Sequence, residues 1–181
     1  MKKPPQPTHH LELRVHALEQ LFNSLDPTPF LNKDLDREAE AFIESWALEF
    51  SSNDHLHITI HVEQPVSEGD ATQLMTEAIH NYFTYKTGRV IGELKRLLKE
   101  GRFSLVVGLA FVTLCLFGAE IIGQAIAGTA FSVVREGLTI IGWVALWRPM
   151  QIFLYDWWPL VRRIRIYKNL VHAHIRVQSS R

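Results

Sequence analysis

The sequence predicts an α+β protein, in which a small three-stranded cytoplasmic domain built from both chain ends is joined to a two-helix transmembrane hairpin. Three features of the 181-residue chain support this prediction. Two long apolar runs lie in its second half, three stretches alternate between apolar and polar residues, and cations flank the apolar runs. The length suffices for one small domain and a membrane anchor, and is too short for a multidomain enzyme.

The formal net charge is zero, but the two halves of the chain carry opposite charges. Residues 11–70 contain 13 acidic and 3 basic residues, whereas residues 71–181 contain 6 acidic and 14 basic residues. Cys115 is the only cysteine, which excludes an intrachain disulfide and a cysteine-rich zinc site. This composition suits a reducing compartment for the polar parts of the chain.

The N-terminal segments are assigned from their residue patterns. Residues 1–10 are polar, contain three prolines and lack the apolar segment of a secretory signal, so they are predicted to form a disordered tail. Residues 11–15 alternate between apolar and polar side chains, which predicts a half-buried strand. Asp34 or Asp36 is expected to cap a helix whose apolar residues recur every three or four positions as far as Phe50.

The remaining segments of the domain are also predicted from the spacing of their apolar residues. Residues 56–62 show the clearest alternation in the chain and predict a second strand. Helical spacing returns over residues 70–100, which predicts a long amphipathic helix that bends at Gly101 into the first span. Residues 160–178 are expected to supply a last helix and strand, and together with residues 11–100 they would complete the domain.

Two apolar runs predict the transmembrane hairpin, residues 103–158. Phe103–Ala119 is uncharged and close to the minimum length that crosses about 30 Å of hydrocarbon. Gly137–Tyr155 is interrupted only by Arg148. The expected spans are about 103–122 and 137–158. The alternative, two buried core helices in a soluble protein, is disfavoured because so small a core rarely needs two wholly apolar helices in succession.

The orientation of the hairpin follows from its flanks. Ten cations flank the spans on their outer sides, whereas only Arg135 lies between them. The ten are Lys86, Arg89, Lys95, Arg96, Lys99, Arg102, Arg162, Arg163, Arg165 and Lys168. Because cytoplasmic flanks are rich in lysine and arginine, both termini are predicted to face the cytoplasm across a bacterial inner membrane. Trp157 and Trp158 are predicted to lie in the interfacial aromatic belt.

Two segments of the chain have distinctive patterns. The first is Ser24–Phe30, with the pattern SLDPxPF, and the second is Trp143–Pro159, with the pattern WxxxWRPxxIFLYDWWP. Together with residues 34–46 they resemble a family of uncharacterised bacterial two-span inner-membrane proteins, and the resemblance covers most of the chain. It implies the location and the two-span architecture, and it brings no known activity, cofactor or catalytic residue.

Seven of the nine histidines fall on the polar faces of the predicted strands: His10, His16, His55, His57, His61, His172 and His174. Alternate histidines on one strand could share a transition metal or titrate as a charge switch between about pH 6 and 7. The metal candidates among them are His55, His57, His61, His172 and His174. Because no cysteine or carboxylate lies at ligand spacing beside them, we interpret them as a solvated sheet face and predict no metal or cofactor.

Arg148 is the one charge inside the second apolar run. It precedes Trp157 by nine residues, which places it about 13 Å from that interface, near the bilayer centre. A charge there is a functional hypothesis by default, and Pro149 frees a backbone carbonyl that could receive it. In the alternative arrangement the second span ends at Trp147, residues 150–161 lie along the membrane surface, and Arg148 is an interfacial anchor.

Other polar residues of the hairpin are Glu120, Arg135 and Glu136. If the chain turns at Gly128, Glu120 and Arg135 are level and could form an ion pair or contact a second subunit. No nucleophile or metal-ligand set accompanies them, so no catalytic residue is predicted. The small residues that recur four apart in this region, and would let a second helix approach, are Ala119, Gly123 and Ala127.

The basic stretch Lys86–Arg102 adjoins a span, so anionic lipid headgroups are a simpler partner than nucleic acid. Part of its charge is expected to be paired along the helix, with Glu93 one turn from Arg89 and Glu100 one turn from Arg96.

Three classes of function remain. The favoured one is a non-enzymatic membrane protein that assembles homo-oligomers or docks a cytoplasmic protein. The alternative is a small oligomeric channel or transport component, with Arg148 and Glu120 at subunit contacts. An enzyme is the least favoured, because no phosphate-binding, metalloprotease, serine-hydrolase or dinucleotide fingerprint is present.

Overall fold

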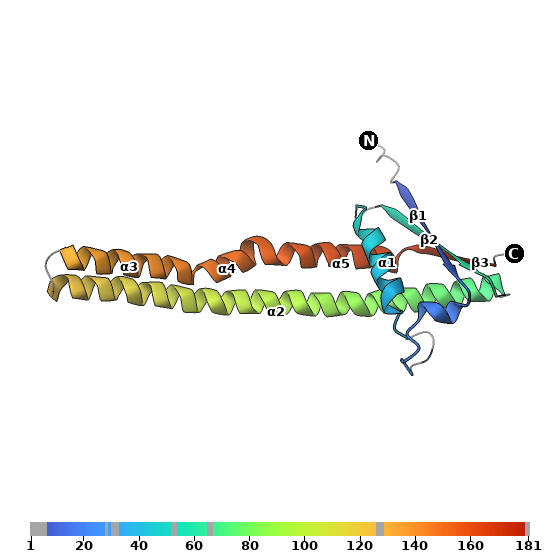
Figure 1. Ribbon diagram of the computed structural model, residues 1–181, viewed down its shortest axis with the longest axis horizontal. Helices are drawn as coiled ribbons and strands as arrows, with labels where there is room; N and C mark the ends of the chain where they lie inside the picture. The colour runs from blue at the N-terminus through green and yellow to red at the C-terminus, as the bar shows by residue number, and fades with distance from the viewer. Residues whose placement is uncertain are drawn as a thin grey trace. The chain divides into compact units, whose positions relative to one another are not determined.

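A computed structural model describes residues 7–27, 29, 33–51, 54–64, 67–125 and 129–179. The chain divides into two compact units. Unit 1 comprises residues 1–91 and 161–181, and unit 2 comprises residues 92–160. Two helices, α2 (Glu68–Ala125) and α5 (Trp157–Val171), contribute residues to both units (Figure 1).

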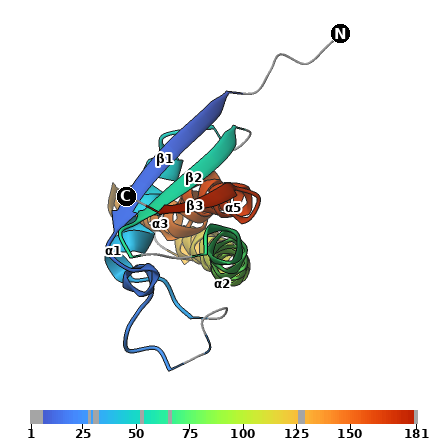
Figure 2. The ribbon, with the colours of Figure 1, turned by 90° about the vertical axis from the view of Figure 1, so that its right-hand side faces the viewer.

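Unit 1 contains a three-stranded parallel sheet in the order β1-β2-β3 (Figure 2). Its strands are β1 (Thr8–Val15), β2 (His55–Val62) and β3 (His174–Ser179). The first two come from the N-terminal part and the third from the C-terminal end, which confirms the predicted α+β architecture assembled from both chain ends. Parallel neighbours need long connections. The 3₁₀ helix η1 (Leu18–Leu21) and α1 (Arg37–Leu48) lie between β1 and β2, and all the remaining helices lie between β2 and β3.

The core of unit 1 lies between one face of this sheet and the helices. The inward residues of β2 are fully or almost fully buried, as the predicted alternation requires. The helices contribute the buried side chains Ile43 (α1), Met75 and Phe83 (α2), and Tyr167 and Leu170 (α5). The α1 helix begins after Asp36, whose Oδ1 accepts a hydrogen bond of 2.9 Å from the Glu38 N–H, so Asp36 is the N-cap.

The observed elements differ from the predicted ones at three places. Thr8–His10, predicted as part of a tail, belong to β1; residues 1–6 of that tail lie outside the described residues. His172, predicted on the last strand, precedes it, because β3 begins at His174; the His172 Nδ1 lies 2.7 Å from the Lys168 carbonyl oxygen at the end of α5. Finally, α2 continues through Gly101 as one helix of 58 residues.

In unit 2, α3 (Thr129–Ala145) and α4 (Trp147–Gln151) run beside the second half of α2 (Figure 1). They continue into the π-helical segment η3 (Ile152–Asp156). The helical stretches Gly69–Ile121 and Ser132–Val171 are each long and apolar enough to cross a membrane, and could form a hairpin.

Candidate functional site

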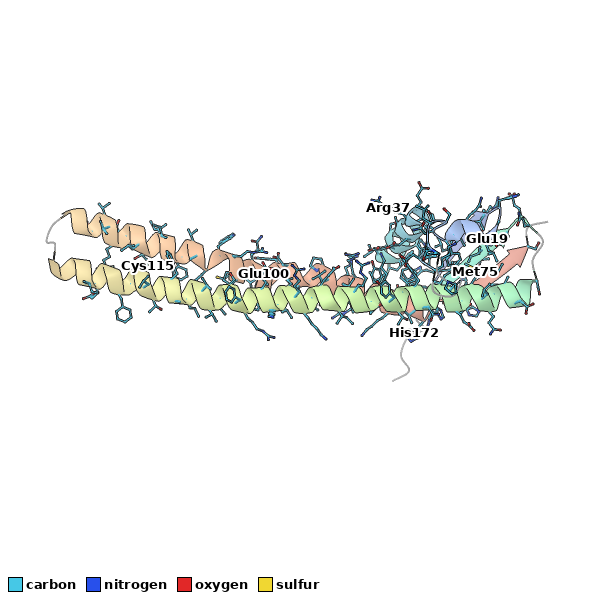
Figure 3. The ribbon with its side chains drawn as sticks, turned by 90° about the horizontal axis from the view of Figure 1, so that it is seen from below. Glu19, Arg37, Met75, Glu100, Cys115 and His172 are labelled. Carbon is cyan, nitrogen blue, oxygen red and sulfur yellow. The ribbon has the colours of Figure 1, made fainter. Side chains whose placement is uncertain are left out.

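Small residues set the contact between the two arms of unit 2. One arm is the second half of α2, and the other is formed by α3, α4 and η3. A Cβ at Gly101 would lie 2.8 Å from Ile152 Cγ2, and a Cβ at Gly108 would lie 3.1 Å from the Ala145 carbonyl oxygen. Proline at position 149 has no N–H to pair with that carbonyl. The bare backbone of Gly108 therefore accommodates the carbonyl that Pro149 frees. Cys115, between α2 and α3 (Figure 3), and Ala119 are also buried on this side of α2.

Arg148 lies between these two close contacts and forms a three-residue ion-pair cluster. Its Nη2 is 3.2 Å from Glu100 Oε1 on α2, and its Nη1 is 3.2 Å from Asp156 Oδ2 at the end of η3. The Arg148 side chain is 51% exposed, Glu100 is 54% exposed and Asp156 is 29% exposed. The contact with Glu100 thus joins the two arms, whereas the contact with Asp156 stays within the arm that carries Arg148.

The partners of Arg148 differ from those predicted. Its partners are Glu100 and Asp156 of its own chain rather than freed carbonyls or Glu120. Glu100 precedes the apolar run that begins at Phe103, so the guanidinium of Arg148 reaches the N-terminal end of that run. This pairing fits the alternative interpretation, in which Arg148 is an interfacial anchor.

The other polar residues predicted in the hairpin are not brought together. Glu120, Arg135 and Glu136 are exposed, and among the described side chains no ion pair joins Glu120 to Arg135. Arg135 and Glu136 line an open hollow on α3 together with Ser132, Thr139 and Ile140. Of the small residues predicted to pack, Ala119 is buried, whereas the side chains at 123 and 127 lie outside the described residues.

Trp157 and Trp158, which were predicted to lie in the aromatic belt, are the first two residues of α5. Trp157 Nε1 donates a hydrogen bond of 2.8 Å to the Phe153 carbonyl, and its ring contacts Trp158 edge-on with centroids 5.7 Å apart. Trp143 and Trp147, which were not predicted to lie in the belt, are at least as exposed as Trp158. These three rings are available to a surrounding phase, whereas Trp157 is partly buried.

Unit 1 contains a second polar cluster, which sequence reasoning missed. Glu40 on α1 accepts a hydrogen bond of 2.6 Å from the Tyr82 hydroxyl and forms an ion pair with Lys86, both on α2. The side chains of Lys86 and Glu40 are only 21% and 18% exposed. Burial and the Glu40 carboxylate raise the pKa of Tyr82 well above its usual value, so the hydroxyl remains a donor.

One turn further along α1, Glu44 makes the matching contact with α5. Glu44 Oε1 lies 3.2 Å from Arg163 Nε, and Arg163 Nη2 donates a hydrogen bond of 2.9 Å to the Tyr167 hydroxyl. Burial raises the pKa of Tyr167 to about 12. Arg162 also donates to the Leu48 carbonyl at 2.8 Å. The α1 helix is thus tied to both long helices, and we call the Glu40 and Glu44 contacts the α1 clasp.

The histidines on the open face of the sheet form a row across all three strands. His10, His57 and His174 are in register, with ring centroids 5.0 Å and 5.1 Å apart. His61 lies 3.7 Å from Glu12, and His16, just beyond β1, lies 2.9 Å from Glu63. Within the described residues, no group of three or more His, Cys, Asp or Glu side chains is arranged to hold a metal ion.

The histidine row gives the domain a predictable pH dependence. Burial, followed by the neighbouring His10, His174 and His55, lowers the pKa of His57 from its ordinary 6.5. The unfolded chain then binds a proton more readily than the folded one, so stability should fall as the pH drops below about 6.5. Denaturant unfolding from pH 7.5 to pH 5.5 should show a smaller loss in His57→Gln than in the wild type. If His57→Gln lost as much stability as the wild type over this pH range, protonation of His57 would be excluded as the cause. His172→Gln, at an exposed histidine, serves as control.

The glycine contact in unit 2 gives a second prediction. Gly108→Leu should weaken the hairpin by about 1–3 kcal/mol, because the side chain has no room beside Ala145 and Leu146. Gly118→Leu is a matched control on the same helix, since a Cβ at Gly118 meets nothing within 4 Å. Unfolding by titration with a denaturing detergent measures both variants. Equal stability of the two would show that the close approach at Gly108 does not hold the arms together.

Comparison with protein families, with curated proteins and with solved structures finds no match to this chain.

Proposed function

We propose that the chain is a two-span protein of the bacterial inner membrane whose unit 1 faces the cytoplasm, and that it acts without catalysis as a homo-oligomeric scaffold or partner-docking module. The observation that carries the proposal is the apolar exposure of unit 2. Only 17% of the most apolar window of each candidate span is buried within the chain. A core helix of a soluble protein would be mostly buried, so a surrounding apolar phase best accounts for this surface.

The charge distribution supports the orientation. The ten flanking cations lie outside the two spans, and Arg135 alone lies between them. Reporter fusions after residue 128 and after residue 181 should therefore report opposite sides of the membrane, and an insertion after residue 64 should match the fusion after 181. If the fusions after residues 128 and 181 reported the same side of the membrane, one of the two proposed spans would be wrong.

An exposed charge within the first proposed span supports an oligomer. Glu120 is exposed beside the exposed apolar residues Phe117 and Ile121, and a charge within a span costs up to about 2.5–3.5 kcal/mol when it faces the hydrocarbon centre. A contact between copies would shield this carboxylate. Cross-linking through Glu120→Cys in native membranes should trap a dimer or larger species, with Cys115 replaced by alanine. Monomer alone would exclude the homo-oligomer.

The channel alternative required Arg148 at a contact between subunits. Because Arg148 is paired within its own chain, no specific observation favours a channel over a scaffold.

A further inference from the structure

The cations near the base of the hairpin fall into two groups. Arg148, Arg162 and Arg163 each contact groups within the chain. The second group consists of Lys95, Arg96, Lys99 and Arg102, which are exposed and for which the described part of the chain shows no carboxylate partner. The sequence predicted that Glu100 would be available to Arg96, but Glu100 is paired with Arg148. The structure therefore leaves this group uncompensated.

Three of these cations lie on one face of α2. Lys95, Lys99 and Arg102 are spaced by four and three residues, which brings them into line along a helix. The next positions of the same line are Val106, which is 65% exposed, and Leu109, which is 50% exposed. Gly101 and Gly108 lie on a different face, which packs against the second arm. Figure 3 shows long side chains that extend from α2 near Glu100 away from that arm.

We propose that this stripe (Lys95, Lys99, Arg102, Val106 and Leu109) binds an anionic phospholipid. The negatively charged phosphate of the headgroup contacts the three cations, and an acyl chain lies along the apolar continuation. The guanidinium of Arg102 is at the junction, where its planar donors match phosphate oxygens. The inference rests on the proposed membrane location and adds a specific lipid class to it.

The continuity of the stripe favours a lipid over an acidic protein. A carboxylate-rich partner would need only the cations and would leave Val106 and Leu109 exposed. A phospholipid covers both parts at once, because its charge and its apolar chains are joined in the same order.

The test uses the full chain in nanodiscs that contain phosphatidylglycerol diluted in phosphatidylcholine, followed by counting of the lipids retained after extraction into mild detergent. The wild type should retain phosphatidylglycerol in preference to phosphatidylcholine. The triple variant Lys95→Gln, Lys99→Gln, Arg102→Gln should lose apparent affinity on the order of 100-fold. The control Arg14→Gln, Arg37→Gln, Arg176→Gln removes the same charge from exposed positions in unit 1 and should retain the lipid.

Each outcome decides the proposal. Equal loss in the triple variant and its control, or no preference in the wild type, would overturn it. Displacement of the lipid by an acidic peptide or by glycerol phosphate alone would also overturn it, since the acyl chain would then contribute nothing. Leu109→Ser should weaken retention without changing the headgroup preference. Lys99→Gln provides a milder variant if the triple one does not fold. Insertion of every variant is checked by the fusion after residue 128, so a failure to insert is distinguished from a failure to bind lipid.

Discussion

Replacing Glu40 with alanine is expected to lower the free energy of unfolding by about 3 kcal/mol, because it leaves two partners on α2 unpaired in a largely buried setting. Tyr82→Phe keeps the ion pair between Glu40 and Lys86 and should cost about 1 kcal/mol. Chemical denaturation of the protein in detergent, followed by tryptophan fluorescence, measures both changes.

The control for this prediction is Glu38→Ala. Glu38 is an exposed acid in the first turn of the same helix, so its loss should cost less than about 1 kcal/mol. Similar effects of Glu38→Ala and Glu40→Ala would show that general acidity of α1 matters and that the contact with α2 does not. Glu44→Ala tests the α5 side of the clasp in the same way, because it removes the carboxylate from Arg163.

The strands were largely predictable because burial on one face imposes a period of two. Residues 56–62 of β2 follow this rule without exception. The start of β1 was missed because His9, a polar residue, takes an inward position, where its ring stacks 3.8 Å from that of Phe50 and its Nε2 lies 3.1 Å from Asp54. The alternation of apolar and polar residues indicates which face of the sheet a side chain occupies only when inward residues are apolar and outward residues are polar. The parallel pairing of the strands has no local signature.

The α1 clasp was missed for a different reason. Glu40 and Tyr82 are 42 residues apart in the chain, and Glu44 and Arg163 are 119 residues apart. No spacing rule links such distant positions. A local signal did exist, since the three pairs Glu40 and Glu44, Tyr82 and Lys86, and Arg163 and Tyr167 are each separated by one helical turn. Only the packing of three helices shows that these pairs meet.

Arg148 was identified from the sequence as an unusual charge, but its partners were not. The prediction measured its height from Trp157 along a continuous straight helix. In the structure the turn at Leu146, Pro149 and the π-helical segment η3 interrupt that helix. Such interruptions change the direction in which successive side chains point, so the height of a side-chain tip cannot be obtained from residue count.

Arg148→Leu is expected to destabilise the hairpin by about 0.5–2 kcal/mol, because two partly exposed ion pairs, with Glu100 and Asp156, are both lost. Arg148→Lys should be intermediate, since an ammonium group lacks the fork that contacts two carboxylates at once. Detergent-induced unfolding measures the changes, and a double-mutant cycle with Glu100→Leu should give a coupling energy of about 0.5–3 kcal/mol. Arg135→Leu is the control, since it removes a cation of the same unit that has no ion pair with Glu120. If Arg148→Leu instead left unfolding unchanged and dissociated the oligomer, Arg148 would act between copies, and a pathway between subunits would replace the scaffold as the favoured function.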